Sequence, residues 1–344
     1  MRRRRRGRHQ GDGAVTGTPR GVDTETSVLL LVQHEPPPDL DELRRLCRVE
    51  IGEGARLREQ LTEHRVLYIW DYFWDRQTDE LREAWPDHAA IEWAHIANVG
   101  VDKIDFPELR SSLRLLSNAA GVYERPIAEY VLAAHLFFAK RLRRIDSLQR
   151  ARTWHRIETR PIAGGVATIV GAGPIGREIA RLLEAVGMGV RLVGRTARTE
   201  PGGLRIAAAA ELADLAAESD LLVLAAPLTD ETRHMTGAEE LRALGDRGVL
   251  VNVGRGELVD DTALTAALAS RSIAGAALDV FSEEPLAARS PYWGYDNCLV
   301  SSHLSGAVDG WKSRLAGVFS ENLRRFVGDE QLENLVPSRR GASS

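Results

Sequence analysis

Cysteine, lysine and long apolar runs are all scarce in this chain of 344 residues. The two cysteines, Cys47 and Cys298, are too few and too far apart for a disulfide framework or a cysteine-based zinc site, which fits a reducing cytoplasm. No stretch reaches the length of about 18 apolar residues that a membrane span requires, because the richest runs, at 28–32 and 221–228, are only as long as strands. We therefore expect a soluble, cytoplasmic protein without a membrane partner.

Positive charge is concentrated at the start of the sequence. Residues 1–27 carry seven arginines against three acids, whereas the whole chain has a net charge of −4. The acidic remainder lacks the clustered Lys and Arg that nucleic-acid binding requires. Residues 1–27 show no hydrophobic periodicity, so we expect a disordered tail. A solvated tail or a start codon placed too early explains these residues. The functional alternatives are a polyanion-binding arm and an export signal, although no apolar segment follows the arginines.

Strand-like and helix-like segments alternate through the rest of the chain, which is typical of α/β proteins. In the first part we expect strands near 28–32, 66–70, 91–96 and 113–116, and helices near 40–46, 79–84 and 127–142. In the second part we expect strands near 165–170, 189–193, 220–225 and 248–253, and helices near 174–186 and 311–326. The strands lack polar alternation, which indicates parallel sheets covered on both faces. The length allows about two domains.

A glycine motif follows the strand predicted at 165–170 and opens the next helix. In Gly171-Ala-Gly173-Pro174-Ile175-Gly176, the first glycine would permit a tight turn, the second a close approach of a diphosphate, and the third close packing of helix on strand. Pro174 suits a first helical turn, where its missing N–H costs nothing. The free N–H groups of this turn attract phosphate. The motif in this setting predicts a dinucleotide site; a glycine-rich turn without ligand is the alternative.

The end of the following strand predicts which dinucleotide binds. NAD-binding proteins usually place an acidic residue there to bind the ribose 2′-hydroxyl. This chain instead has Gly194-Arg195-Thr196-Ala-Arg198, in which two arginines and a threonine could bind a 2′-phosphate. We therefore expect NADP(H), with NAD(H) as the second choice. The alternative is that these arginines only solvate a loop, since arginine is common in this chain.

Three further segments carry a more specific pattern: VNVGRGELVD at 251–260, GAALDVFSEEPL at 275–286 and SSHLSG at 301–306. Their order and spacing after the glycine motif resemble the D-isomer-specific 2-hydroxyacid dehydrogenases, and the resemblance covers essentially residues 28–335. In that family the Arg of the R-G dipeptide, the acid before Pro and the later His are catalytic. The resemblance therefore assigns these roles to Arg255, Glu284 and His303.

The residue types suit that chemistry. A guanidinium such as that of Arg255 can hold the carboxylate of a 2-oxo acid through charge-assisted hydrogen bonds. An imidazole such as that of His303 can donate a proton to the carbonyl oxygen during reduction and accept one during oxidation. A carboxylate such as that of Glu284 can orient the ring. Glu283 is the neighbouring rival for this role, and each residue could instead be structural.

The resemblance also implies supporting roles. Asn98-Val99-Gly100 matches a loop whose backbone N–H groups, here those of Val99 and Gly100, help to hold the substrate carboxylate. The cofactor-binding positions that it implies beyond the glycine motif and the arginines are Pro227 and Thr232 under the adenosine, Asp279 near the nicotinamide carboxamide, and Val253. We expect no metal ion.

Two aromatic features depart from the family pattern or extend it. Tyr72-Phe73-Trp74 would follow a strand where the family has small or aliphatic residues, so these rings either roof the pocket or pack in the core. Trp154 lies where family members extend an arm across a dimer. Its ring either reaches the neighbouring active site or is buried at the subunit contact.

The resemblance implies an α/β fold with two doubly wound parallel-sheet domains. A Rossmann-type cofactor domain (123–306) would be inserted into a flavodoxin-like substrate domain (28–122 and 307–335), followed by a frayed tail (336–344). It implies reduction of a small 2-oxo acid, such as glyoxylate or hydroxypyruvate, to its D-2-hydroxy acid by a homodimer. The alternatives are a cofactor-sensing binding protein of the corepressor kind and a D-3-phosphoglycerate dehydrogenase, whose substrate would need extra basic residues.

Overall fold

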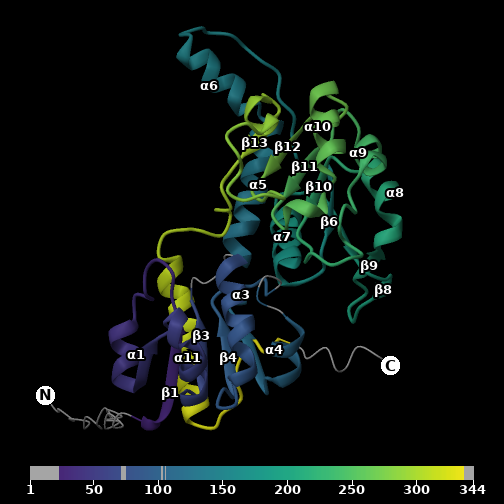
Figure 1. The fold of residues 1–344 in the computed structure, drawn as a ribbon. Coiled ribbons are helices and arrows are strands. Elements are labelled where there is room, and N and C mark those ends of the chain that lie inside the picture. Colours follow the sequence, from purple (N-terminus) through teal and green to yellow (C-terminus); the bar gives the residue numbers. More distant parts are fainter. Residues whose placement is uncertain (1–22, 71–74, 102–103, 105, 337–344) are drawn as a thin grey trace, which may run out of the picture.

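The computed structural model describes residues 23–70, 75–101, 104 and 106–336. Two lobes, each built on one β-sheet, make up the molecule (Figure 1). Helix α5 (Glu124–Ala139) leads from the first lobe to the second, and the chain returns to the first lobe before α11 (Trp311–Val327). Within the described ranges no helix combines the length and the apolar character needed to cross a membrane.

The five-stranded lobe contains a parallel sheet in the order β2-β1-β3-β4-β5. Its strands are β1 (Asp23–Leu31), β2 (Cys47–Ile51), β3 (Val66–Ile69), β4 (Trp93–Ile96) and β5 (Leu115–Asn118). Its helices are α1 (Leu40–Leu46), α2 (Leu57–Glu63), α3 (Asp75–Ala84) and α4 (Pro107–Ser112), with short 3₁₀ turns η1 (Gly54–Arg56) and η2 (Trp85–Asp87). This strand order is that of a flavodoxin-like sheet.

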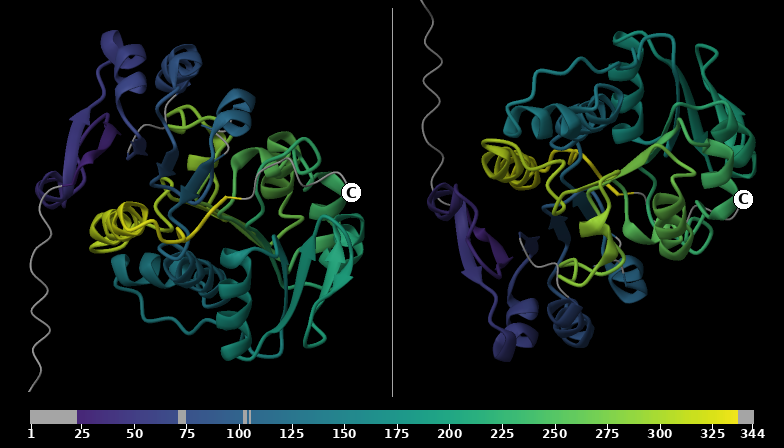
Figure 2. Two further views of the ribbon diagram at one scale, coloured as in Figure 1. Left: turned by 90° about the horizontal axis from the view of Figure 1, so that it is seen from below. Right: turned by 90° about the horizontal axis from the view of Figure 1, so that it is seen from above.

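Helix α11 belongs to this lobe although it follows the other lobe in sequence. The ring of Phe319 stacks on that of Tyr68, with the ring centroids 3.6 Å apart, and lies 5.3 Å from the ring of Trp93. Both views of Figure 2 show α11, in yellow, beside the N-terminal strands. Leu335 then forms an antiparallel bridge to Ser117 in β5. The first lobe is thus completed by a segment that the chain supplies last.

The eight-stranded lobe has the order β13-β12-β11-β10-β6-β7-β9-β8, in which β8 alone is antiparallel to its neighbour. Its strands are β6 (Val166–Val170), β7 (Gly189–Gly194), β8 (Arg198–Thr199), β9 (Arg205–Ala208), β10 (Leu221–Leu224), β11 (Val249–Asn252), β12 (Gly275–Leu278) and β13 (Cys298–Val300). Its helices are α7 (Pro174–Ala185), α8 (Leu212–Ala217), α9 (Ala238–Leu244) and α10 (Asp261–Ser270), with η3 (Ala209–Glu211), η4 (Gly256–Leu258) and η5 (Pro291–Gly294). The order reverses direction between β6 and β10, the point at which Rossmann folds bind their ligands.

Two boundaries differ from those expected. Strand β1 begins at Asp23, five residues earlier than predicted, and Thr26 and Ser27 are buried. Residues 23–27 of the expected tail therefore belong to the first lobe, and residues 1–22 lie outside the described ranges. The helix predicted to reach residue 142 ends at Ala139, because Arg141 adopts a left-handed conformation with φ of 52°. A separate helix, α6 (Leu142–Arg150), follows and projects away from both lobes (Figure 1).

Candidate active site

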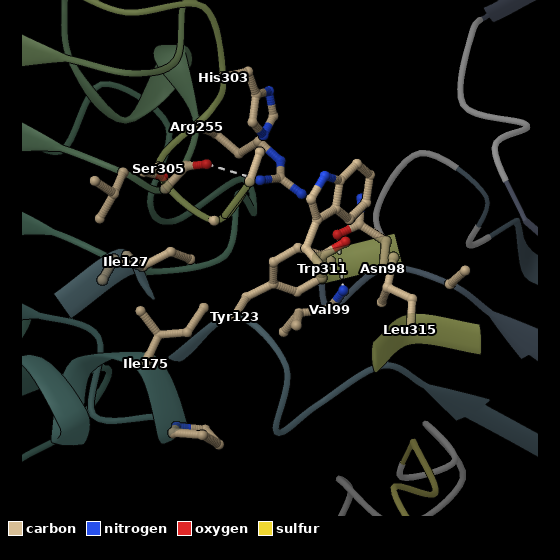
Figure 3. A pocket seen from close by; sticks show the side chains of 18 of the residues that line it. Asn98, Val99, Tyr123, Ile127, Ile175, Arg255, His303, Ser305, Trp311 and Leu315 are labelled. Atoms are coloured by element: carbon tan, nitrogen blue, oxygen red, sulfur yellow. Dashed lines mark hydrogen bonds between the residues drawn. The ribbon is translucent and has the colours of Figure 1, made fainter. Parts of the chain in front are cut away.

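A cleft of about 710 Å³ lies between the two lobes and brings together residues from distant parts of the chain. Its volume falls within the usual range for small-molecule sites. Nine of the site residues predicted from sequence line it: Val99, Gly100, Gly173, Pro174, Ile175, Pro227, Val253, Arg255 and His303. Figure 3 shows the side chains of Arg255 and His303 on one side of this cleft, with Trp311 and Asn98 facing them.

The glycine loop has the local geometry that a dinucleotide requires. Gly171 has φ of +115°, and a Cβ atom there would lie 2.5 Å from the carbonyl oxygen of Ala225, so only glycine fits. A Cβ atom on Gly176 would collide with the carbonyl oxygen of Gly171. Around Gly173, by contrast, no atom of another described residue lies within 4 Å of the Cβ position. This open space at the N-terminus of α7 fits a diphosphate against unpaired backbone N–H groups.

The arginines after β7 are exposed, but one of them already has a carboxylate partner. Arg198 donates from Nε to Glu200 Oε1 at 3.2 Å, and Arg177 Nη2 donates to both oxygens of Glu200 at 2.8 Å. The hydrogen bond from Arg177 holds the pKa of Glu200 below its ordinary value. Sequence reasoning missed this acid, because the β8–β9 hairpin returns Glu200 to the end of β7.

Arg195 has a different environment. It is exposed and makes no ion pair within 4 Å with another described residue. The pKa of Glu231 is lowered mainly by a hydrogen bond from Thr229, and more weakly by the positive charge of Arg195. Thr196 is also exposed. Arg195 is thus more available than Arg198 for an ion pair with a phosphate group.

Thr232 stabilises the loop that carries Pro227 into the cleft. Its hydroxyl donates to the carbonyl oxygen of Pro227 at 2.8 Å and accepts the backbone N–H of Thr229 at 2.8 Å. Pro227 lines the cleft, whereas Thr232 is absent from its lining. The structure therefore gives Thr232 a supporting place in this loop.

Arg255 follows β11, and its local sequence directs it into the cleft. The buried Asn252 donates from its amide to the carbonyl oxygen of Arg255 at 2.8 Å and accepts the N–H of Gly254 at 3.1 Å, which fixes the turn. Gly256 passes so close to the backbone of Phe281 and Ser282 that a Cβ atom would collide with it. The R-G dipeptide thus combines a side chain that lines the cleft with a glycine that allows two backbone segments to pass close together.

His303 and Glu284 form a hydrogen-bonded pair. His303 Nδ1 lies 2.9 Å from Glu284 Oε2, so the ring nitrogen donates to the carboxylate, and the other carboxylate oxygen accepts the N–H of Phe281 at 3.0 Å. The His303 side chain is 48% exposed and that of Glu284 is 19% exposed. Glu283, the rival for the role of Glu284, is exposed and has no described contact with the histidine. The geometry favours Glu284.

Asp279, which the resemblance places near the nicotinamide carboxamide, is bonded in this structure to the turn that carries His303. It is fully buried, and its carboxylate accepts the N–H groups of Leu304 and Ser305 at 2.9 Å each. It is absent from the residues that line the cleft. The carboxylate therefore lies beneath the turn that carries His303, where its bonds go to the protein itself.

The loop at Asn98 offers one free backbone donor rather than two. The side chain of Asn98 accepts the N–H of Val99 at 2.8 Å, and Asn118 donates to the carbonyl oxygen of Val99 at 2.9 Å. Within the described part of the chain no hydrogen bond is found for the N–H of Gly100. Gly100 is thus the better candidate for holding a carboxylate.

Among the described residues, the aromatic side chains that line the cleft come from the end of β3, the residue before α5 and the first residue of α11. Trp70, Tyr123 and Trp311 line the cleft, and burial raises the pKa of Tyr123. Sequence reasoning instead pointed to Tyr72, Phe73 and Trp74, which lie outside the described residues. Trp154, on the arm after α6, is 99% exposed and is not among the described residues that line the cleft.

One further cluster has the composition of a metal site. Ligand atoms of Glu50, Glu63 and His64 lie within 4.8 Å of one another. The guanidinium of Arg48, however, lies 2.9 Å from Glu50 and 3.6 Å from Glu63, and Gln60 donates to Glu50 at 2.7 Å. A cation of the protein itself therefore already neutralises these carboxylates.

Comparisons with known proteins agree with this geometry. Residues 132–305 match the family model described as D-isomer specific 2-hydroxyacid dehydrogenase, NAD binding domain. A glyoxylate reductase from Aeropyrum pernix is 36% identical over 248 residues, which cover 69% of this chain and 74% of that protein. A glyoxylate/hydroxypyruvate reductase A from Arabidopsis thaliana is 32% identical over 243 residues, covering 70% and 76%.

Solved structures share the whole fold. The NADPH-dependent glyoxylate/hydroxypyruvate reductase from Sinorhizobium meliloti, in complex with NADP and malonate, aligns with a TM-score of 0.75 and 24% identity over 92% of this chain and 98% of that one. The two-lobed architecture, the glycine loop that fits a dinucleotide and the matches in sequence lead to one assignment. The chain is an oxidoreductase that belongs to the D-isomer specific 2-hydroxyacid dehydrogenase family.

Proposed function

We propose that this protein reduces a small 2-oxo acid to its D-2-hydroxy acid with NADPH. The observation that carries the proposal is that Arg255 and His303 line the same cleft as the glycine loop, with Glu284 hydrogen-bonded to His303. The relatives named glyoxylate reductase or glyoxylate/hydroxypyruvate reductase support a substrate of two or three carbons.

Each of the three residues has a distinct task in this proposal. Arg255 binds the substrate carboxylate through charge-assisted hydrogen bonds, and the N–H of Gly100 adds another donor from the opposite lobe. His303 uses Nε2, the nitrogen that Glu284 leaves available, to donate a proton to the carbonyl oxygen. Glu284 holds the imidazole ring through its hydrogen bond to Nδ1.

The nicotinamide dinucleotide, when bound, supplies the hydride that reaches the carbonyl carbon. Gly173 and the first turn of α7 would hold its diphosphate. Arg195, with Arg198 and Thr196 beside it, would bind a 2′-phosphate, which favours NADPH over NADH. Glu200 opposes this preference, because it holds Arg198 and could itself accept a 2′-hydroxyl.

We also propose that two copies of the chain associate through the arm that includes α6 and Trp154. This arm exposes Leu142, Ile145 and Trp154 to solvent in the single chain, and large exposed apolar groups of this kind mark contact surfaces. Sedimentation equilibrium of the native chain beside Trp154→Ser tests this step. A native monomer at micromolar concentration would contradict it.

The function is tested by following NADPH absorbance at 340 nm with glyoxylate, hydroxypyruvate and pyruvate. We expect turnover with at least one of them, formation of the D-product, and a loss of about 10²- to 10⁴-fold in kcat for His303→Ala. A native protein that binds NADPH but turns over none of these acids would contradict the proposal.

A further inference from the structure

An ion pair occupies the side of the cleft that belongs to the five-stranded lobe. Lys312 is the second residue of α11, and Glu35 lies in the segment between β1 and α1. The Lys312 ammonium donates to Glu35 Oε2 at 2.6 Å, and both residues line the cleft. Among the described residues that line the cleft, Lys312 is the only Lys or Arg besides Arg255, and Glu35 is the only carboxylate. The cleft therefore has charged groups on both lobes.

Contacts within the five-stranded lobe hold this pair in position. The indole N–H of Trp70, a residue that is 4% exposed, donates to the carbonyl oxygen of Glu35 at 2.8 Å and fixes the backbone there. Lys312 Nζ lies 6.0 Å from the ring centroid of Trp311. In Figure 3 the side chain of Trp311 faces Arg255 across the cleft. The ion pair is thus next to an aromatic ring that faces the proposed substrate anchor.

The stability of α11 does not explain the lysine at its start. The first turn of an α-helix carries partial positive charge, which disfavours a cation there. The first turn of α11 has no acidic residue that would offset the charge of Lys312. Glu35 supplies a negative charge, but the two side chains are 45% and 73% exposed, and an ion pair this exposed contributes little to stability. A ligand in the cleft is therefore the better explanation for the pair.

The two charges together determine which ligand group fits beside them. A hydroxyl group accepts a hydrogen bond from the ammonium and donates one to the carboxylate, so it can bind both without separating them. A methyl group displaces water from the two charges and offers no hydrogen bond in return. A second carboxylate is attracted by Lys312 but repelled by Glu35 beside it. A neutral hydroxyl group is thus the ligand that the pair favours.

We propose that Lys312 and Glu35 are specificity-determining residues that bind a hydroxyl group on carbon 3 of the substrate. This inference rests on the proposed function and narrows its substrate class to 2-oxo acids with a hydroxyl next to the 2-oxo group. Arg255 and His303 bind the carboxylate and the carbonyl oxygen from the eight-stranded lobe, and the ion pair binds the hydroxyl from the five-stranded lobe. Recognition of the substrate chain is therefore separate from the chemistry at its carbonyl carbon.

Lys312→Met tests the ammonium group while keeping an unbranched side chain. The assay compares kcat/KM for hydroxypyruvate and pyruvate, which differ by one hydroxyl group. A hydrogen bond to a charged group contributes about 10- to 100-fold, and the partial exposure of Lys312 favours the lower end, so the preference for hydroxypyruvate should fall about tenfold. The loss should appear in KM, because the contact is the same in the ground state and the transition state. The inductive effect of the hydroxyl on the carbonyl is equal in both proteins and cancels.

Glu35→Gln should change the preference in another direction. The variant removes the negative charge that repels a second anion but keeps an acceptor oxygen. Because the pair is partly exposed, kcat/KM for oxaloacetate relative to pyruvate should rise only about two- to fivefold. A native protein that prefers oxaloacetate to hydroxypyruvate would overturn the proposal, since Lys312 would then bind an anion.

Arg324→Met and Glu42→Gln are the matched controls. Arg324 Nη2 donates to Glu42 Oε1 at 2.7 Å, and this pair also joins α11 to the segment after β1, with both side chains about half exposed. Neither residue is among the described ones that line the cleft. Both variants should keep the native ratio of hydroxypyruvate to pyruvate. A native ratio in Lys312→Met, or an equal fall in Arg324→Met, would overturn the proposal.

Binding of the product acids separates this inference from the proposed function. Isothermal titration calorimetry with NADP⁺ present gives the Kd of D-glycerate and of D-lactate, the 2-hydroxy acids that correspond to hydroxypyruvate and pyruvate, without any turnover. We expect D-glycerate to bind about tenfold more tightly, and Lys312→Met to remove the difference. A native protein that turns over no 2-oxo acid but shows this difference would refute the reaction and retain the hydroxyl site. Equal Kd values for the two acids in the native protein would refute the hydroxyl site.

Discussion

Replacing Glu284 by Gln removes one charge while keeping the shape of the side chain. Its Oε2 lies 2.9 Å from His303 Nδ1, and its Oε1 accepts the N–H of Phe281. A hydrogen bond to a charged group contributes about 1.5–3 kcal/mol, which corresponds to about 10- to 100-fold in rate. Because the His303 side chain is 48% exposed, water offsets part of this loss, so we expect the lower end, about tenfold in kcat/KM.

Glu283→Gln is the control. It also removes one negative charge, but from an exposed side chain at the neighbouring position. The assay is kcat/KM for glyoxylate at saturating NADPH, followed at 340 nm. Glu283→Gln should retain the native value. Native activity in Glu284→Gln, or an equal loss in both variants, would refute the assignment of Glu284 as the partner of His303.

Three other perturbations follow from the geometry. Arg195→Asp should lower kcat/KM with NADPH by about 10- to 100-fold and favour NADH; a native enzyme that already prefers NADH would refute this cofactor assignment. Gly173→Ala should keep the native thermal midpoint but weaken NADPH binding measured by fluorescence, whereas Gly171→Ala should lose at least about 2 kcal/mol of stability from its φ of +115°. Burial lowers the pKa of His135 to about 4, so the folded state favours the neutral ring. The contribution of the neutral His135 ring to the free energy of unfolding is therefore fully present above the unfolded-state pKa of about 6.5. It is lost as the pH falls towards 4, and the loss reaches up to about 2 kcal/mol at pH 5. Urea unfolding at pH 7.5 and 5 should show this loss in the native protein and less of it in His135→Gln.

The sequence predicted those parts of the fold whose signal is local. The glycine loop is recognisable because steric limits at Gly171 and Gly176 act over a few residues of strand, turn and helix. The apolar runs of β3, β6, β10 and β11 are visible because every residue or nearly every residue in them is buried. The boundaries failed where a single backbone conformation decides them, as at Arg141.

The site was harder to predict where partners come from distant segments. Glu200 was not predicted because β8 consists of only two residues, both of them exposed. No local sequence pattern therefore indicates the hairpin that brings the Glu200 carboxylate to Arg198. The Val99 N–H was taken as a free donor because nothing in the sequence shows that the Asn98 side chain turns back to it. Asp279 was matched by family position, while its buried contacts with residues 301–305 depend on strand packing.

The convergence of Arg255 and His303 on one substrate is tested most directly by a crystal structure of the protein with NADP⁺ and oxalate, a dicarboxylate that resembles glyoxylate. We predict that one carboxylate of oxalate bonds to the Arg255 guanidinium while an oxygen of the other lies within hydrogen-bond distance of His303 Nε2. Oxalate bound elsewhere, or bound in the cleft with His303 turned away from it, would contradict the proposed chemistry.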